Sequence, residues 1–238
     1  LLKSRGIDLE RLVVINVVTI EQFRQKALQA VDIYLKKSEE DRSPCMFVLD
    51  SLGMLSTEKE IRDALDDKQV RDMTKSQLVK GAFRMLTLKL GQANIPMIVT
   101  NHTYDVIGSY VPTKEMGGGS GLKYAASTII YLSKKKEKDG TDVVGNLIKA
   151  KTAKSRLSKE NKDVTVRLYY DERGLDKYYG LLELGELGGL WKNVAGRYEI
   201  GGKKVYAKAI LKEPETYFTE EVMEKLDAIA KEEFSYGS

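Results

Sequence analysis

The chain has 238 residues, of which 42% are hydrophobic and 31% charged, and its formal net charge is +4. Such a chain can bury a substantial core, which excludes disorder over most of its length and predicts one domain of ordinary size plus a small appendage. No apolar window reaches the roughly 18 residues that span a bilayer and no signal peptide opens the sequence, so we expect no membrane partner. The single cysteine, Cys45, excludes a disulfide framework and predicts a buried thiol in a cytoplasmic protein.

The positive charge is concentrated in one segment. Residues 134–162 contain ten Lys or Arg against four acidic residues, which leaves the rest of the chain slightly negative. A basic segment on a near-neutral protein indicates either a polyanion as partner or a solvated lysine face. Charge alone does not distinguish these two interpretations.

The first half of the sequence alternates between apolar runs and helical periodicity. Nearly continuous apolar runs predict strands buried on both faces at residues 12–18, 45–52 and 97–100. Apolar residues at helical spacing predict helices over residues 19–37 and 74–93, the second starting at a capping box formed by Thr74 and Gln77. This order of strands and helices predicts an α/β fold with a parallel sheet.

The pattern changes after Ala126. Strand candidates at residues 128–133, 146–151 and 164–170 follow one another through turns such as KDGTD at 138–142, so we expect the sheet to continue in antiparallel fashion. Short glycine-rich strands at 196–206 and an amphipathic helix at 219–234 predict a small α+β domain. We therefore expect two domains: residues 1–178, with a mixed, mainly parallel central sheet flanked by helices, and residues 179–238.

The stretch MFVLDSLG places Asp50, followed by Ser51, at the carboxyl end of a predicted buried strand. In α/β sheets this edge binds ligands, and a carboxylate there can hold magnesium-bound water beside a nucleoside triphosphate. An aspartate that only caps the following turn is the other interpretation.

His102, the only histidine, ends the next predicted strand. A polar side chain at this position can hydrogen-bond a terminal phosphate and pass the presence of that phosphate to the loop beyond. The alternative is a histidine that ends a strand and satisfies local backbone groups.

Two long polar stretches follow these strand ends. Residues 103–121 exceed an ordinary connection, and their side chains can stack on bases while their glycines approach phosphates. The candidates in this loop are Tyr104, Tyr110, Lys114, Gly117, Gly118 and Gly119. Residues 56–73 carry the cations Lys59, Arg62, Lys68 and Arg71. A plain mobile linker is the alternative for the first stretch, and a surface helix for the second.

Lys154 and Arg156 occupy alternate positions just after a predicted strand. Two cations that project to one side of an extended segment can clamp phosphate and neutralise charge that develops in phosphoryl transfer. Exposed lysines at a strand edge that discourage aggregation are the other interpretation.

Taken together, these segments resemble the core of the RecA family of recombinases, and most of all the UvsX-type recombinases of tailed phages. MFVLDSL resembles the Walker B strand of this family, NIPMIVTNHT its phosphate-sensing strand, and EMGGGSGLKYAAS the close of its second DNA-binding loop. AKSR at 153–156 resembles the paired cations that reach across a subunit interface, and the glycine-rich sequence from residue 178 resembles the start of the C-terminal domain.

The resemblance implies a RecA-like ATPase core with ATP and Mg²⁺ as cofactors. Asp50 would organise magnesium beside Ser51, and His102 would contact the γ-phosphate where bacterial members of the family carry glutamine. Lys154 and Arg156 would act in trans on the ATP of a neighbouring subunit. Tyr169 or Tyr170 would lie near the adenine, and residues 56–73 and 103–121 would be the two DNA-binding loops.

The function implied by the resemblance is an ATP-dependent DNA recombinase. It would form helical filaments on single-stranded DNA and exchange strands with homologous duplex DNA in recombination, repair and recombination-dependent replication. Single-strand-binding and mediator proteins would be further partners, and the host cytoplasm would be its location if a phage encodes it.

One departure from the family is that the sequence contains no Walker A loop, G-x-x-x-x-G-K-S/T; GGGSGLKY has the wrong spacing. We expect a longer parent protein that supplies this loop before Leu1, and we expect the chain alone to hold nucleotide poorly. Two other functions stay open. One is a RecA-fold hexameric helicase or ATPase, and the other is a non-catalytic regulatory paralogue that binds DNA or a recombinase.

Overall fold

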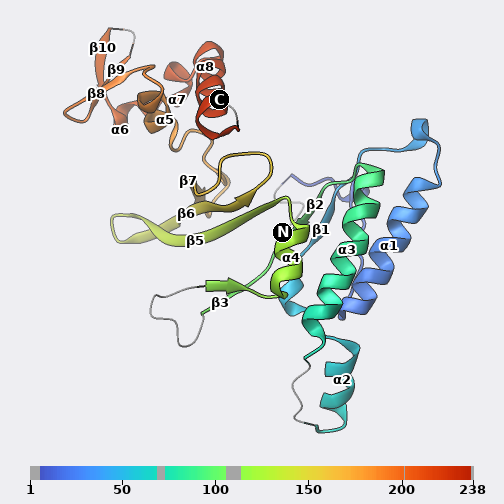
Figure 1. Cartoon of the computed structure of the whole chain (residues 1–238). Coiled ribbons are helices and arrows are strands. Elements are labelled where there is room, and N and C mark those ends of the chain that lie inside the picture. Colours follow the sequence, from blue (N-terminus) through green and yellow to red (C-terminus); the bar gives the residue numbers. More distant parts are fainter. Residues whose placement is uncertain (1–5, 69–72, 106–113, 201, 237–238) are drawn as a thin grey trace. The chain divides into compact units, whose positions relative to one another are not determined.

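The computed structural model describes residues 6–68, 73–105, 114–200 and 202–236. These residues form two compact units, residues 1–126 and residues 127–238 (Figure 1). Helices and strands occur in both units, as the predicted α/β class requires. The predicted domain boundary between residues 178 and 179 stays a prediction.

Two parallel strands and two long helices form the centre of the first unit. β1 (Phe47–Leu49) pairs in parallel with β2 (Met97–Val99), with Val48 opposite Ile98. The helices α1 (Ile20–Leu35) and α3 (Lys75–Ala93) lie side by side next to these strands (Figure 1). The last strand, helix and strand of the predicted order are therefore confirmed as β1, α3 and β2.

The two long helices form because each buries one apolar stripe. In α1 the buried residues are Ile20, Phe23, Ala27 and Val31. In α3 they are Val79, Ala82, Phe83, Leu86, Leu90 and Ala93. Together with Leu49, Leu52, Leu55, Ile95 and Leu122 they make one continuous hydrophobic core.

The predicted capping box at Thr74 and Gln77 is wrong. Thr74 has helical backbone angles, φ −88° and ψ −15°, and makes no side-chain cap hydrogen bond, whereas a capping residue needs extended backbone. The capping box belongs to the shorter helix α2 (Glu58–Leu65), where Thr57 and Glu60 bond each other's backbone N–H. In Figure 1, α2 projects beyond the end of α3.

Two further predictions about the first unit are wrong. Residues 12–18 form no strand, and Val13 is 83% exposed. An apolar run becomes a strand only with a partner, and the one bridge next to this run joins Thr19 to Ser56. Cys45 is exposed rather than buried, because β1 starts two residues later, at Phe47.

The second unit begins with three antiparallel strands, as predicted. β5 (Thr128–Asp139), β6 (Asp142–Ser155) and β7 (Asp163–Tyr169) pair in that order, and β5 turns into β6 within the predicted turn. Among the described residues this sheet is separate from β1 and β2. A single mixed central sheet stays a prediction.

A second hydrophobic core lies in the rest of this unit. The strands β8 (Lys192–Val194), β9 (Arg197–Ile200) and β10 (Lys203–Tyr206) form a meander. Around it lie α5 (Leu181–Leu187), α6 (Ala207–Ile210), α7 (Pro214–Tyr217) and α8 (Glu220–Phe234). The core contains Tyr178, Leu182, Trp191, Tyr198, Ile210, Phe218 and Leu226. The predicted final helix is confirmed, with Thr219 as its N-cap.

The first unit also contains short 3₁₀ helices, at Leu9–Arg11, Glu39–Asp41 and Leu52–Met54. None of the described helices has the length and apolar character needed to cross a membrane.

The first core generates a stability prediction with a control on the same helix. Leu86 is 0% exposed and Leu88 is 70% exposed, both in α3. Leu86→Ala should lower the free energy of unfolding by about 2–5 kcal/mol, because it removes buried apolar surface and leaves a cavity. Leu88→Ala should change it by less than about 0.5 kcal/mol. Urea unfolding followed by circular dichroism measures both, and equal losses would contradict the placement of α3.

Candidate nucleotide and DNA site

The candidate site of the first unit lies where β1 and β2 end. Asp50 follows β1 and is exposed, and its Oδ1 accepts a 2.6 Å hydrogen bond from Thr100 Oγ1, which follows β2. The backbone adds bonds from Thr100 N to Leu49 O and from Leu52 N to Thr100 O, both 3.0 Å. The peptide bond between Asp50 and Ser51 is cis. The two strand ends are thus fixed against each other, with the carboxylate at their edge.

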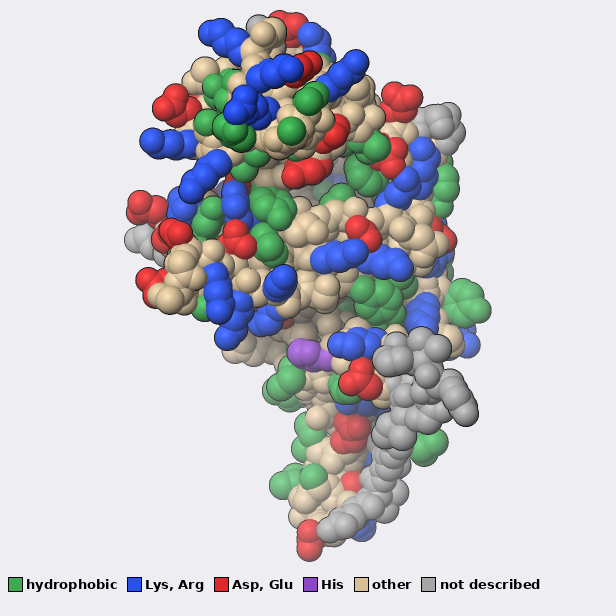
Figure 2. Space-filling view, turned by 90° about the vertical axis from the view of Figure 1, so that its left-hand side faces the viewer, with side chains coloured by type: hydrophobic (Ala, Val, Ile, Leu, Met, Phe, Trp, Pro, Cys, Tyr) green, Lys and Arg blue, Asp and Glu red, His purple; other side chains and the backbone are tan. Residues whose placement is uncertain are grey.

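His102 follows Thr100 by two residues and directly precedes the loop. Its imidazole is exposed and visible on the surface in Figure 2. A Cβ placed on Gly53 would lie 2.6 Å from His102 Cδ2, so the ring packs directly over that glycine. The His102 N–H donates to Asn101 Oδ1 at 2.9 Å, and the His102 carbonyl accepts from Gly117 N at 3.2 Å.

The predicted loop starts as a β-hairpin. β3 (Thr103–Asp105) pairs antiparallel with β4 (Lys114–Met116), so that Asp105 faces Lys114. Asn101 Nδ2 donates to the Gly117 carbonyl at 2.7 Å and closes the base of the hairpin. Tyr104 is exposed on β3, whereas Tyr110 lies outside the described residues.

The glycines of the loop have a structural role at the hairpin base. Gly118 and Gly119 have φ of +92° and +70°, which residues with a side chain rarely adopt, and they lead from β4 into α4 (Gly119–Ala125). A Cβ on Gly118 would also meet Val79 of the core at 3.2 Å. Part of the glycine signal in the sequence therefore reflects this turn, and contact of these glycines with DNA stays a prediction.

The cations of residues 56–73 lie on and after α2. Lys59 pairs with Asp63 at 2.6 Å along the helix, and Lys68 pairs with Asp66 at 2.8 Å. Arg62 is exposed on α2, and Arg71 lies outside the described residues. The surface helix considered from the sequence is confirmed for residues 58–65, and a DNA contact there stays a prediction.

Lys154 and Arg156 lie at the end of β6 in the second unit. Lys154 is half-buried and pairs with Ile129, and Arg156 continues the ladder by donating its N–H to Ser127 O at 3.0 Å. Ser155 between them is only 5% exposed. Ser155 is the last residue of β6, and Arg156 lies in the bend that follows it.

Tyr170, the candidate adenine contact, lies just after β7 and is exposed. Its hydroxyl donates to Asn146 Oδ1 at 3.4 Å. The neighbouring Tyr169 ring contacts two guanidinium groups, that of Arg173 at 3.7 Å and that of Arg167 at 5.1 Å from the ring centroid. The two guanidinium groups partly cover the ring of Tyr169, whereas Tyr170 is exposed at the end of β7.

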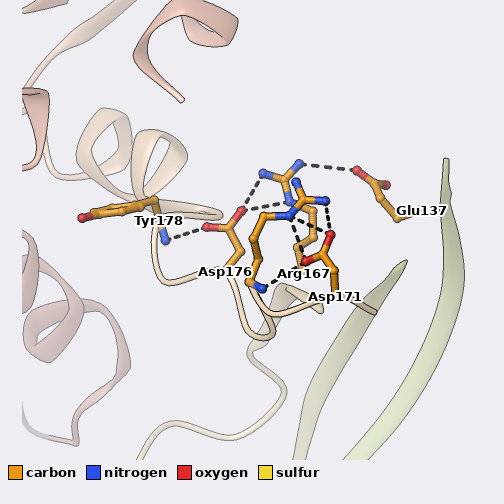
Figure 3. A network of polar contacts seen from close by, with 6 residues as sticks. Glu137, Arg167, Asp171, Asp176 and Tyr178 are labelled. Carbon is orange, nitrogen blue, oxygen red and sulfur yellow. Dashed lines mark hydrogen bonds and ion pairs between the residues drawn. The ribbon is translucent and has the colours of Figure 1, made fainter. Parts of the chain in front are cut away.

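Arg167 forms a polar network that the sequence analysis missed. It bonds Asp176 at 2.6 Å and Glu137 at 3.4 Å (Figure 3). Its guanidinium also lies over the ring of Tyr179, 4.8 Å from the ring centroid. Partial burial lowers the pKa of the guanidinium, but its hydrogen bonds with Asp176 and Glu137, together with the charges of Tyr169 and Asp176, raise that pKa above its usual value. The network joins β5, β7 and the chain that enters α5. The sequence could have indicated this network through the position of Arg167, a charged residue among the apolar residues of a predicted strand.

A metal at this site would have to be held mainly by ligands other than protein carboxylates. Among the described residues no three His, Cys, Asp or Glu side chains are grouped as a metal cage. Asp50 instead offers a single carboxylate, of which one oxygen is bonded to Thr100. This donor set fits Mg²⁺, which commonly binds one or two carboxylates together with water and substrate phosphates.

The cations of the molecule do not form one continuous patch on the visible face. Figure 2 shows Lys and Arg side chains there with acidic side chains interspersed among them.

Comparison with known proteins assigns the family. The family model for the RecA N-terminal domain matches residues 2–176. The chain is 36% identical over 198 residues to a recombination and repair protein of Enterobacteria phage T4, covering 83% of this chain and 49% of that protein. It is 30% identical over 219 residues to protein RecA of Francisella tularensis subsp. novicida, covering 89% of this chain and 58% of that protein. The chain thus spans about half the length of the curated relatives it matches, and it belongs to the RecA family.

Proposed function

We propose that the protein is an ATP-dependent DNA recombinase, which forms filaments on single-stranded DNA and exchanges strands with homologous duplex DNA. The observation that carries this proposal is the set of contacts after β2, where Thr100 bonds Asp50, and Asn101 and His102 bond the base of the hairpin. Three adjacent residues thereby connect a carboxylate suited to Mg²⁺ with a loop suited to DNA. The names of the relatives from phage T4 and Francisella support the same function.

In this proposal the first unit holds one side of the nucleotide. Asp50, next to Ser51, orients water molecules around Mg²⁺, and the exposed imidazole of His102 donates a hydrogen bond to the terminal phosphate. Bound Mg²⁺ would supply neutralisation of charge on the phosphates. This chain contains no Walker A loop, so we propose that the complete recombinase supplies that loop from a further segment.

The second unit acts on the nucleotide of a neighbouring subunit. Lys154 lies near the end of β6 and Arg156 directly after it, and the two cations can stabilise the charge that develops on the transferred phosphoryl group. Tyr170 offers its exposed ring to the adenine. A site divided between subunits makes hydrolysis dependent on filament assembly.

DNA binding is assigned to the hairpin and to the α2 region. Tyr104 and Lys114 lie on the two hairpin strands, and Gly117 to Gly119 form the base. Lys59, Arg62 and Lys68 supply cations near α2. Aromatic faces and cations bind single strands without reading base edges, so the proposal predicts little sequence preference. Since DNA is the substrate, the proposal places the protein in the cytoplasm, with single-strand-binding and mediator proteins as further partners.

The division of the site between subunits generates the first test. In the complete recombinase, Lys154→Ala or Arg156→Ala should lower DNA-stimulated ATP hydrolysis by about 10³-fold or more, as the loss of a trans cation does. Each variant should keep the thermal stability of the wild type. Mixed with a Walker A variant, it should regain activity, because an intact Walker A loop then meets an intact cation pair. Normal hydrolysis by both single variants would refute the assignment.

His102 generates the second test. We expect His102→Ala to keep ATP binding but to lose most of the gain in DNA affinity that ATP induces, a coupling typically of about 1–3 kcal/mol. His102→Gln should retain part of this coupling, because an amide also donates a hydrogen bond to phosphate. Fluorescence anisotropy of labelled single-stranded DNA, with a non-hydrolysable ATP analogue and with ADP, measures it. An alanine variant with the wild-type difference between the two nucleotides would reduce His102 to a residue that merely ends a strand.

A further inference from the structure

The end of α8 is bonded to the connection between β6 and β7. We call residues 232–236 the clasp. Lys159 donates its backbone N–H to Phe234 O at 2.8 Å and its Nζ to Glu232 O at 3.0 Å. Lys162 forms an ion pair with Glu233, and Ser158 forms an antiparallel bridge with Ser235.

The last contact of the clasp reaches the segment that carries the two candidate cations. Tyr236 Oη donates a 3.1 Å hydrogen bond to the carbonyl of Ser155. That carbonyl belongs to the peptide unit between Ser155 and Arg156, whose N–H donates to Ser127 O at 3.0 Å. Both polar atoms of this peptide unit are therefore held, one by the clasp and one by the start of β5.

The Ser155 side chain is fixed as well. Its Oγ accepts hydrogen bonds from Leu157 N at 3.1 Å and from Ser158 N at 3.0 Å. Its backbone N–H donates to Glu160 Oε1 at 3.0 Å. Ser155, the residue between Lys154 and Arg156, is thus held through its N–H, its side chain and its carbonyl.

We propose that the clasp positions Lys154 and Arg156 for their action on a neighbouring nucleotide, with Tyr236 and Glu233 as the positioning residues. The inference rests on the proposed function of the two cations. Charged groups that stabilise a transition state act best when they are held in place before the reaction. A displacement of about 1 Å at such a group can cost about 10²-fold in rate, so a hydrogen bond to the adjoining peptide unit bears directly on turnover.

The helix α8 has an anchor besides the contacts of the clasp. That helix is anchored by Leu226, which is buried in the second core. The Tyr236 side chain is itself 55% exposed, so Tyr236→Phe removes one hydroxyl and leaves the surrounding packing in place. Variants of the clasp should therefore fold normally. A change in their exchange rates or turnover can then be assigned to the lost contact rather than to unfolding.

The first arm of the test measures whether the peptide unit is held. Tyr236→Phe should raise the amide hydrogen-exchange rate of Arg156 about tenfold in the full chain, followed by NMR, and Glu233→Gln should raise that of Lys159. The matched controls are Tyr206→Phe and Glu221→Gln. In the wild type, the Tyr206 hydroxyl accepts a hydrogen bond from Arg197, and Glu221 pairs with Lys225 on α8. The controls should leave both rates unchanged. Unaltered exchange in the clasp variants would overturn the proposal.

The second arm measures turnover in the complete recombinase. Tyr236→Phe should lower kcat for DNA-stimulated ATP hydrolysis about tenfold with an unchanged KM for ATP, and should cause no further loss in an Arg156→Ala background, as expected for residues that act together. Wild-type kcat, or the same loss in both backgrounds, would overturn the positioning role. Wild-type hydrolysis by Arg156→Ala alone would instead refute the proposed function of the cations. That outcome is therefore distinguishable from a failure of the positioning role.

Discussion

Three consecutive residues after β2 connect the ends of β1 and β2 with the base of the hairpin in the first unit. Thr100 holds the carboxylate of Asp50 through its hydroxyl, Asn101 holds the Gly117 carbonyl through its amide, and the His102 backbone bonds Gly117 from the other side. The three residues that make these bonds are adjacent in the sequence. A displacement of one of them therefore shifts its neighbours as well. In the proposed function, this chain of polar contacts is the route by which a change at the nucleotide reaches the hairpin.

A comparable constraint operates in the second unit, at the peptide unit before Arg156. There the sequence supplies two cations, but the structure adds what keeps them in place: Ser127 on one side and Tyr236 on the other. The Tyr236 contact spans 81 positions of sequence and joins the end of α8 to the end of β6. The Arg167 network has the same character, since it ties β5 and β7 to the chain that leads into α5.

The parts of the fold that could be predicted from the sequence are those set by local pattern. The apolar stripes of α1, α3 and α8 and the turn between β5 and β6 are properties of neighbouring residues, and all were predicted. The parts that could not be predicted depend on distant partners. Residues 12–18 are apolar enough for a strand, yet a ladder needs a second strand, and the exposure of Cys45 follows from where β1 begins.

The candidate site shows the same division. The strand-end positions of Asp50 and His102 could be predicted because apolar runs end there, but the hydroxyl of Thr100 and the amide of Asn101 carry no sequence signal that distinguishes them from ordinary polar residues. Likewise, Gly117, Gly118 and Gly119 were predicted for DNA contact, and the positive φ angles of Gly118 and Gly119 show that these two glycines also form a turn. Arg167 was overlooked because a single charge in a strand has many possible partners, and only the fold identifies Asp176 and Glu137.

The central claim is that one nucleotide is shared between the Asp50 edge of one subunit and the Lys154–Arg156 face of the next, with the hairpin turned to DNA. Electron cryo-microscopy of the complete recombinase on single-stranded DNA, with a non-hydrolysable ATP analogue, tests it most directly. The account predicts Asp50 and His102 of one subunit, and Lys154 and Arg156 of its neighbour, around the same triphosphate, and Tyr104 facing the DNA. A nucleotide whose triphosphate contacts neither pair, or a hairpin that faces away from the DNA, would contradict it.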